Sequence, residues 1–157
     1  MNTDNNICIE TKHYPISRGI FLQVEFLYRD DLLIRVLLSI SEKTPPHLTP
    51  CSELIEILKG NIKYNCDLSS CSPFQHKVLN ETRKIPFGKT LSYKDLAQKI
   101  GCPSPRAVGR ALKNNPIPLL IPCHRVLKKG GGLGGFSQGQ EIKSVLLEFE
   151  HENSCNE

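Results

Sequence analysis

The sequence predicts an α/β protein: a small N-terminal β-sheet with a helix, followed by a mostly helical C-terminal half. Two observations predict this division. Residues 20–40 show the pattern of two strands, an alternating run followed by a more continuously apolar one, whereas residues 73–113 contain three short segments that begin with helix-capping signals. The composition changes at the polar stretch 69–72, so we expect one unit over residues 1–70 and a second over residues 71–157.

The N-terminal half predicts a β-hairpin and one helix. Residues 20–28 alternate apolar and polar side chains, residues 29–31 form a polar turn, and residues 32–40 are more continuously apolar. A short helix is expected over residues 51–58, because Gly60 is a natural stop after an apolar stripe. Residues 64–68 are a candidate for one more strand.

Each predicted C-terminal helix up to residue 113 begins at a serine that can cap it. A proline follows both Ser72 and Ser104, and Ser92 precedes Asp95 in a capping box. The short turn 101–103 between the second and third of these helices makes them a candidate helix-turn-helix. The apolar faces comprise Phe74, Val78 and Ile85, then Tyr93, Leu96, Ala97 and Ile100, and, in a last helix from about Gln140, Ile142, Val145, Leu146 and Phe149.

The third of these helices, residues 105–113, has a cationic outward face. Arg106, Gly109, Arg110 and Lys113 recur at helical spacing, opposite an inward side made of Val108, Ala111 and Leu112. The bare glycine among positive charges would let a phosphate backbone approach closely. Three charges also fit a solvated helix face, but the helix-turn-helix setting and the net charge of +4 favour nucleic acid.

Composition excludes several classes of protein. The seven cysteines are an odd, scattered set, so we expect free thiols rather than a disulfide framework. No apolar run is long enough to span a bilayer, and residues 1–6 have neither the basic nor the apolar part of a secretory signal. We therefore expect an intracellular protein.

Cys123 and His124 are the candidate reactive pair. Three prolines in residues 116–122 are expected to forbid a helix and to hold the chain extended. In that conformation neighbouring side chains point to opposite faces, so His124 would reach the sulfur through a bend or a bridging water. A thiol with a pKa of about 8.5 needs a cation, base or helix terminus to become a nucleophile. An inert buried cysteine is the alternative, but the rigid proline frame favours a reactive one.

The other motifs are weaker evidence of function. Gly130, Gly132 and Gly135 match a dinucleotide-binding spacing, but only one helix fits before the chain ends, so a ligand-contacting loop or a plain turn is expected. Cys66, Cys71 and His76 could be zinc ligands, although their spacing is not a common one. No carboxylate pair or Ser-His-Asp signature indicates a hydrolase.

At residues 121–126 the sequence Ile-Pro-Cys-His-Arg-Val resembles the active-site signature of the O6-alkylguanine-DNA alkyltransferases. The resemblance extends from about Pro73 to Glu150, roughly half the chain, and its N-terminal part rests only on a hairpin-and-helix layout, which implies a ribonuclease H-like fold. The other matching motifs are Phe74-Gln75, residues 85–90, Ser92-Tyr93, Leu96-Ala97, residues 106–109 and Asn115-Pro116.

The resemblance implies a catalytic set. Cys123 would accept an alkyl group by in-line displacement, His124 would be the water-linked base and Glu150 would orient the imidazole. Asn115 would brace the turn before the active-site segment, and Tyr93 would donate a hydrogen bond to the departing guanine. This chemistry needs no cofactor and no metal, and it requires the Cys123 sulfur to be ionised and open to a base.

The resemblance also implies how substrate and DNA are bound. Ser137 would contact the damaged oxygen through its backbone, and the carbonyls of Cys123 and Val126 would recognise the exocyclic amine. Arg106 would replace the extruded nucleotide, because the alkylated oxygen is inaccessible within the duplex. The other DNA-binding positions are Ala107, Gly109, Arg110, Ala111 and Lys113, in the minor groove. The chain departs from the family at residues 103–105 and at Gly135 and Gln138, which bear on the range of accepted alkyl groups.

The sequence therefore predicts a single-turnover DNA-repair methyltransferase. Its expected partner is double-stranded DNA containing O6-alkylguanine, with O4-alkylthymine as a further substrate, and we expect a monomer in the cytoplasm, or in the nucleus of a eukaryote, with no membrane partner. One alternative is an alkyltransferase-like protein that recruits repair factors, which the presence of Cys123 disfavours. A second is a helix-turn-helix regulator in which Cys123 senses alkylation.

Overall fold

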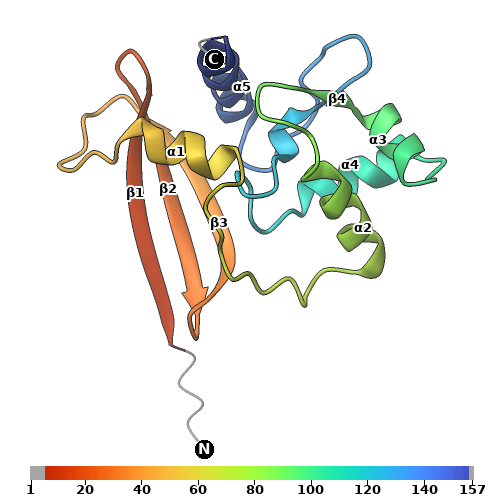
Figure 1. Cartoon of the computed structure of the whole chain (residues 1–157), viewed down its shortest axis with the longest axis horizontal. Helices are drawn as coiled ribbons and strands as arrows, with labels where there is room; N and C mark the ends of the chain where they lie inside the picture. Colours follow the sequence, from red (N-terminus) through yellow and green to blue (C-terminus); the bar gives the residue numbers. More distant parts are fainter. Residues whose placement is uncertain (1–5, 156–157) are drawn as a thin grey trace, which may run out of the picture.

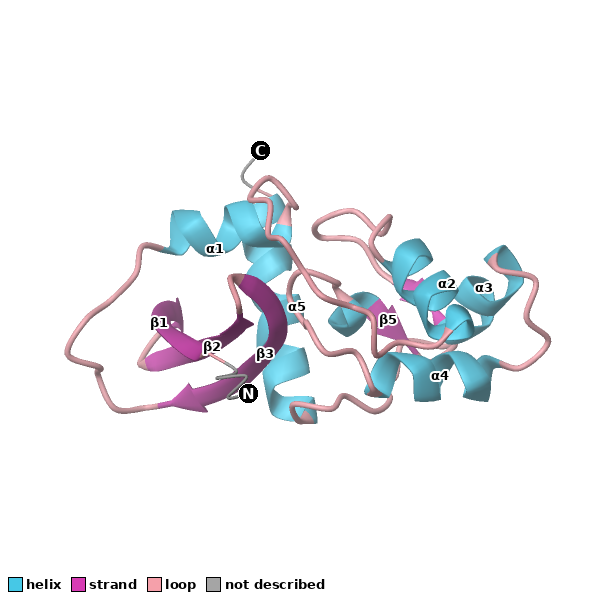
Figure 2. Ribbon diagram, turned by 90° about the horizontal axis from the view of Figure 1, so that it is seen from below, coloured by secondary structure: helices cyan, strands magenta, loops and turns pink. Residues whose placement is uncertain are grey.

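The computed structural model describes residues 6–155 and has a three-stranded antiparallel sheet at one side (Figure 1). The strands β1 (Ile7–Ser17), β2 (Ile20–Arg29) and β3 (Leu32–Ser41) lie in the order β1-β2-β3. Helices α2 to α4 form the other side, and α5 (Gln140–Ser154) lies between the two groups (Figures 1 and 2). The predicted α/β class, with a small sheet and helices, is confirmed.

The predicted hairpin is formed by β2 and β3, and alternate residues of both strands fill the core. Leu22, Val24 and Phe26 of β2 are fully buried, opposite Val36 and Leu38 of β3. Burying these side chains contributes roughly 1.5–3 kcal/mol each to folding relative to leaving them exposed. The hydrophobic alternation therefore identified β2 and its inward face, and the continuous apolar run identified β3.

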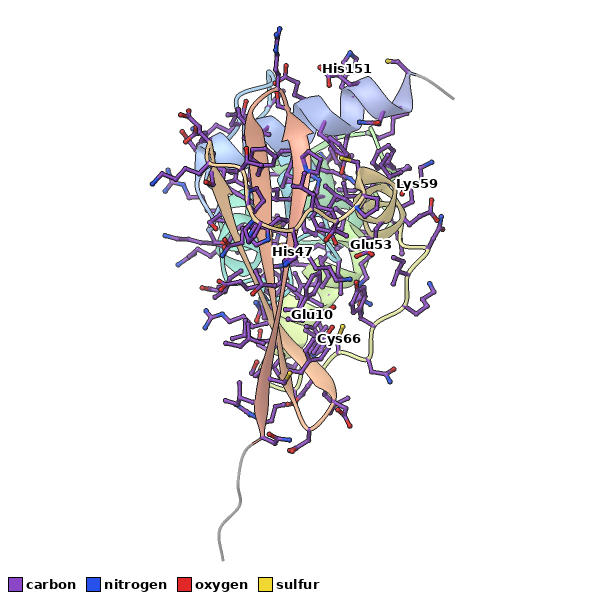
Figure 3. The ribbon with its side chains drawn as sticks, turned by 90° about the vertical axis from the view of Figure 1, so that its left-hand side faces the viewer. Glu10, His47, Glu53, Lys59, Cys66 and His151 are labelled. Carbon is purple, nitrogen blue, oxygen red and sulfur yellow. The ribbon has the colours of Figure 1, made fainter. Side chains whose placement is uncertain are left out.

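Strand β1 was not predicted, because a charged side chain interrupts its inner face. Lys12 faces the core side, where its ammonium lies 5.9 Å from the Phe26 ring centroid and bonds to Glu53 at 2.6 Å. Tyr14, fully buried on the same strand, donates a hydrogen bond to Glu53 at 2.8 Å. Glu53 belongs to α1 (Cys51–Leu58), as Figure 3 shows, so this ion-paired cluster joins β1 to α1.

The three helices of the second half begin at their predicted caps. The side chains of Ser72, Ser92 and Ser104 accept hydrogen bonds from the backbone N–H groups three residues on. They open α2 (Pro73–Thr82), α3 (Tyr93–Lys99) and α4 (Pro105–Lys113) respectively. Helix α4 contacts both α2 and α3, and it buries Val108, Ala111 and Leu112 as predicted.

Three local predictions are wrong. The segment expected to be extended contains a 3-10 turn at Cys123–Arg125, since the last proline, Pro122, precedes this turn and leaves its three residues free to coil. Residues 64–68 form an isolated bridge from Cys66 to Leu33 rather than a strand. Phe74, predicted on the buried side of its helix, is 38% exposed.

The remaining elements connect the 3-10 turn to its surroundings. Residues Leu91–Ser92 (β4) pair in parallel with Val126–Leu127 (β5), directly after the turn. Helix α5 contacts β1, β3 and the turn, so it links the sheet to the candidate site. Within residues 6–155, no helix has the length and apolar character that crossing a membrane requires.

Candidate active site and nucleic-acid surface

Cys123 lies in the first position of the 3-10 turn and is almost completely buried, with 4% of its surface exposed. The Asn115 side-chain amide donates a hydrogen bond to its sulfur at 3.2 Å. Burial nevertheless raises the pKa of the thiol to about 11. The expectation of an ionised, open sulfur is therefore wrong for this state of the protein, because a thiolate is poorly solvated in an apolar interior.

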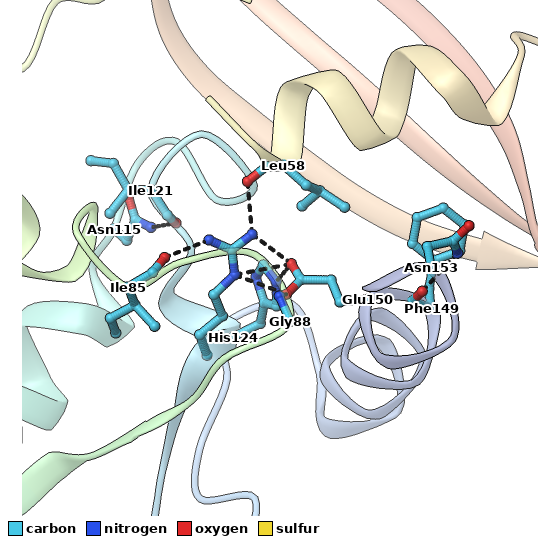
Figure 4. A network of polar contacts seen from close by, with 10 residues as sticks. Leu58, Ile85, Gly88, Asn115, Ile121, His124, Phe149, Glu150 and Asn153 are labelled. Carbon is cyan, nitrogen blue, oxygen red and sulfur yellow. Dashed lines mark hydrogen bonds and ion pairs between the residues drawn. The ribbon is translucent and has the colours of Figure 1, made fainter. Parts of the chain in front are cut away.

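His124 and Glu150, which the family resemblance implies act together, form a buried pair (Figure 4). His124 Nε2 lies 2.6 Å from Glu150 Oε1. Burial favours the neutral forms of both groups and lowers the pKa of His124. Burial alone would raise the pKa of Glu150, but the interactions of Glu150 with His124 and Arg125 lower that pKa to about 2. Because Glu150 is a carboxylate, His124 Nε2 carries the proton that it donates.

The second ring nitrogen of His124 is therefore an acceptor. His124 Nδ1 is buried and has no hydrogen-bond partner among the described residues. A neutral imidazole whose Nε2 is protonated has its lone pair on Nδ1. This tautomer leaves a base directly next in sequence to the candidate nucleophile.

Arg125 is the central cation of the network and was missed as a site residue. Its guanidinium donates to both Glu150 oxygens, at 2.8–3.0 Å, and to the carbonyls of Ile85 and Leu58 at 2.8 and 2.7 Å (Figure 4). Leu58 is the last residue of α1. Arg125 thus joins the N-terminal half, the loop before α3 and helix α5 at one buried point.

Asn115 braces the chain on both sides of the sulfur. Its amide donates to the Ile121 carbonyl at 3.0 Å, in addition to Cys123, and its oxygen accepts from the Ile117 N–H at 3.1 Å. These contacts fix the turn between the end of α4 and the 3-10 turn. Asn115 thus lies where the resemblance implies a brace, and its role in catalysis stays a prediction.

Lys143 is a buried cation beside Tyr93, and the sequence analysis did not identify it. Its side chain is fully buried and donates to the carbonyls of Val126, at 2.7 Å, and Leu133, with longer contacts of 3.4 Å to Gly135 and to the Tyr93 hydroxyl. Burial lowers the pKa of Lys143 to about 8, and its ammonium form has three N–H groups for these four acceptors, one more than the neutral amine. The amphipathic stripe could not reveal it, because its partners are backbone carbonyls distant in sequence.

Tyr93 and the glycine loop 133–140 form the wall of a groove. The Tyr93 hydroxyl donates to the Gly135 carbonyl at 3.2 Å. A Cβ on Gly134, whose φ is +71°, would lie 2.9 Å from the Tyr93 ring, so a side chain cannot fit there. The groove is lined by Tyr93, Arg106, Gly109, Arg110, Lys113, Lys128 and residues 134–136.

The other groups predicted to contact the substrate are Ser137 and the carbonyls of Cys123 and Val126, and none of them belongs to the lining of this groove. Ser137 is exposed and lines a second cavity with Asn115 and Gln138, on the side of the loop that faces β3. The Val126 carbonyl already accepts from Lys143, and the Cys123 carbonyl accepts from the Val126 N–H. Each carbonyl oxygen retains a second lone pair for a ligand.

The cationic face predicted on α4 is exposed. Arg106, Arg110 and Lys113 are solvent-accessible, and all three line the groove described above. Ala107 is half-buried and Ala111 is buried, so these two flank the cationic face rather than standing on it. The basic helix face and the glycine loop therefore line the same groove.

No group of three or more potential metal ligands occurs within residues 6–155, so Cys66, Cys71 and His76 do not form a metal site. The seven cysteines are all free thiols. Of these, Cys123 is the one that the structure surrounds with a base, a hydrogen-bond donor and a nearby cation.

Residues 73–152 match the family model described as the DNA-binding domain of 6-O-methylguanine DNA methyltransferase. A methylated-DNA–protein-cysteine methyltransferase of Methanocaldococcus vulcanius is 52% identical over 95 residues, 60% of this chain and 56% of the relative. One from Saccharolobus solfataricus is 53% identical over 78 residues, half of each chain. The chain thus spans about half the length of the curated relatives it matches.

Solved structures extend the likeness to the whole fold. The O6-methylguanine methyltransferase of Mycobacterium tuberculosis superimposes with a TM-score of 0.70 and 29% identity, covering 93% of each chain. A structure of the M. tuberculosis protein in complex with DNA gives a TM-score of 0.66 and 30% identity, covering 90% of this chain and 93% of the other. The similarity therefore includes the N-terminal sheet.

Proposed function

The chain belongs to the 6-O-methylguanine DNA methyltransferase family, and on that premise we propose that it repairs alkylated DNA by taking the alkyl group onto Cys123. The observation that carries the proposal is the buried arrangement of Cys123 with Asn115, His124 and Glu150. Its substrates are O6-alkylguanine and O4-alkylthymine in double-stranded DNA. The protein acts as a monomer, in the cytoplasm or nucleus, without a membrane partner.

In the proposed reaction the Cys123 sulfur attacks the alkyl carbon in line with the bond to O6. The S–C bond forms as the C–O bond breaks, and the electron pair of the C–O bond stays with the departing guanine. His124 Nδ1 takes the thiol proton through a water, and Glu150 stabilises the resulting imidazolium at Nε2. The thioether product has no leaving group that cellular thiols can displace, so one molecule acts once.

Tyr93 stabilises the negative charge that develops on the departing guanine. Its hydroxyl donates a hydrogen bond to a ring nitrogen, so the guanine does not leave as a bare anion. Burial raises the pKa of Tyr93, which keeps it protonated, and Lys143 lies 3.4 Å away as a donor to the same oxygen. The Ser137 backbone binds the damaged oxygen, and the carbonyls of Cys123 and Val126 bind the exocyclic amine.

The DNA-binding surface is the exposed face of α4. Helices α3 and α4 act as a helix-turn-helix, with Arg106 entering the base stack as the damaged nucleotide is extruded. Arg110 and Lys113 bind phosphates, and the small side chains Ala107, Gly109 and Ala111 permit a close approach in the minor groove. Residues 71–157 form this DNA-binding, alkyl-accepting domain, and residues 1–70 form a ribonuclease H-like domain.

The decisive experiment mixes the protein with a duplex containing O6-methylguanine and measures peptide masses. The peptide containing Cys123 should gain one methyl group per molecule, while a Cys123→Ser variant gains none. Tight binding that leaves the lesion intact would instead favour a recruiter of repair factors. Methylation that changes affinity for one DNA sequence would favour a regulator.

The role of Arg106 is tested by comparing two substrates. Arg106→Ala should slow repair in a duplex at least ten-fold more than it slows reaction with free O6-benzylguanine, which needs no extrusion. Lys94→Ala, an exposed cation of α3, is the matched control. Equal slowing of both reactions by Arg106→Ala would contradict a role in base flipping.

A further inference from the structure

Beyond Leu33, which pairs with residues 65–67, the free edge of the N-terminal sheet bonds to segments around the candidate active site rather than to another strand. β3 is the last strand of the sheet, so its outward N–H groups need partners elsewhere. The Val36 N–H donates to the Pro116 carbonyl, next to Asn115, at 2.9 Å. The Leu38 N–H donates to Gln138 Oε1, also at 2.9 Å.

Gln138 is the side chain by which the glycine loop reaches this sheet. The first part of the loop is held by its own half of the protein, through Lys143 to Leu133 and Gln140 to Gly134, the latter at 2.9 Å. The outer part, residues 136–139, is a turn closed by the Gly139 N–H on the Phe136 carbonyl at 3.0 Å. Its bond to Leu38 crosses to the other half of the molecule.

Several features would allow this outer turn, residues 136–139, to move relative to its surroundings. Gly139 ends the turn and Gly134 precedes it, with φ of +104° and +71°, and glycine can pass between positive and negative φ because it has no Cβ. The loop separates two cavities: the groove lined by Tyr93 and Gly135, and the cavity lined by Ser137 and Gln138. Cys123 is 4% exposed, so a base must displace some neighbouring element to reach the sulfur.

We propose that Gln138 is a positioning residue that latches the loop 133–140, by accepting the Leu38 N–H, in the closed arrangement in which Cys123 is buried; Asn115, which bonds the sulfur, lines the same cavity as Gln138. The N-terminal sheet then controls access of the alkylated base to the thiol, an inference that rests on the proposed function. A net gain of one hydrogen bond in the closed state corresponds to about a five-fold shift between closed and open loop. The side chain of Gln138 thereby sets how readily, and for how large an alkyl group, the site opens.

The test measures access to the thiol without DNA. The full-length protein is labelled with N-ethylmaleimide, and the peptide containing Cys123 is quantified against the exposed Cys155 as internal standard. Gln138→Ala should label Cys123 about five-fold faster than the wild type, because it removes the acceptor. Gln138→Glu keeps an oxygen acceptor and should label at the wild-type rate. Gln98→Ala, on the exposed surface of α3, is the matched control.

The outcomes separate the latch from the repair function. Unchanged labelling in Gln138→Ala, equal acceleration in Gln138→Glu, or acceleration that matches a loss of global stability measured by urea unfolding would each overturn the latch. The methylation assay with damaged duplex is run on the same proteins. Failure of the wild type in that assay overturns the proposed function, whereas the labelling ratio still decides the role of Gln138.

Discussion

Replacing Glu150 by glutamine should destabilise the protein strongly, because Glu150 is the single anion in a buried network of donors. Its Oε1 accepts from His124 and from Arg125 Nε and Nη2, and its Oε2 accepts from Arg125 Nε and the Gly88 N–H. A glutamine has one NH₂ group in place of an oxygen. In either orientation that NH₂ faces at least two N–H donors, and Arg125 becomes an unpaired buried charge.

The magnitude follows from what happens when one partner of a buried ion pair is removed. Such changes cost about 3–5 kcal/mol, since the remaining charge is left without compensation. With a urea m-value of about 2 kcal/mol/M, the unfolding midpoint should fall by about 2 M. Equilibrium urea unfolding followed by circular dichroism measures this shift directly.

Glu148→Gln is the matched control, since Glu148 is exposed on the same helix two residues earlier. That substitution should change the free energy of unfolding by less than about 0.5 kcal/mol. A loss below about 1 kcal/mol in Glu150→Gln would refute the reasoning. It would mean that Arg125 is stabilised by the carbonyls of Ile85 and Leu58 without its carboxylate partner.

Three further outcomes follow from the geometry. Lys143→Met should slow single-turnover methyl transfer about ten-fold, because the carbonyls of Val126 and Leu133 lose their donor and the cation near Cys123 is removed. An unchanged rate would exclude a role of Lys143 in the transfer. Stability should fall as pH drops from about 4.5 towards about 2, since Glu150 is ionised only in the folded state there; Glu150→Gln should flatten this dependence in acid unfolding curves. Ser104→Ala should cost about 1 kcal/mol in urea unfolding through loss of the α4 cap; a change under about 0.3 kcal/mol would contradict it.

The elements predicted correctly are those whose signal is local. The hairpin follows from alternation along residues 20–28, a polar turn and the apolar run 32–40, and the three serine-capped helices follow from capping chemistry within four residues. Strand β1 was missed because Lys12 stands on its inner face, a placement made favourable by Glu53, which is 41 residues away. No window of sequence contains both members of that pair.

The candidate site shows the same limit, since contacts between residues distant in sequence could not be predicted. The resemblance pointed to Cys123, His124 and Glu150, but Arg125 and Lys143 were missed as site residues. Charged side chains are buried only when the fold supplies partners, and these partners are mostly backbone carbonyls, which have no sequence signature. The sealed thiol was also missed, because the 3-10 turn after Pro122 redirects the chain inward instead of leaving it extended.

Burial of Cys123 is consistent with its proposed use as an acceptor that reacts once. A thiol whose pKa burial has raised to about 11 holds far less thiolate at pH 7 than an exposed thiol, whose ordinary pKa is about 8.5. An electrophile or oxidant that reached an exposed, ionised Cys123 would consume the protein without repairing anything. The buried thiol therefore needs both an opened loop and proton removal by His124, which burial keeps neutral and so able to accept a proton. In the proposed reaction an extruded, alkylated base meets both requirements together, so discrimination against other electrophiles comes from access rather than from the intrinsic reactivity of the sulfur.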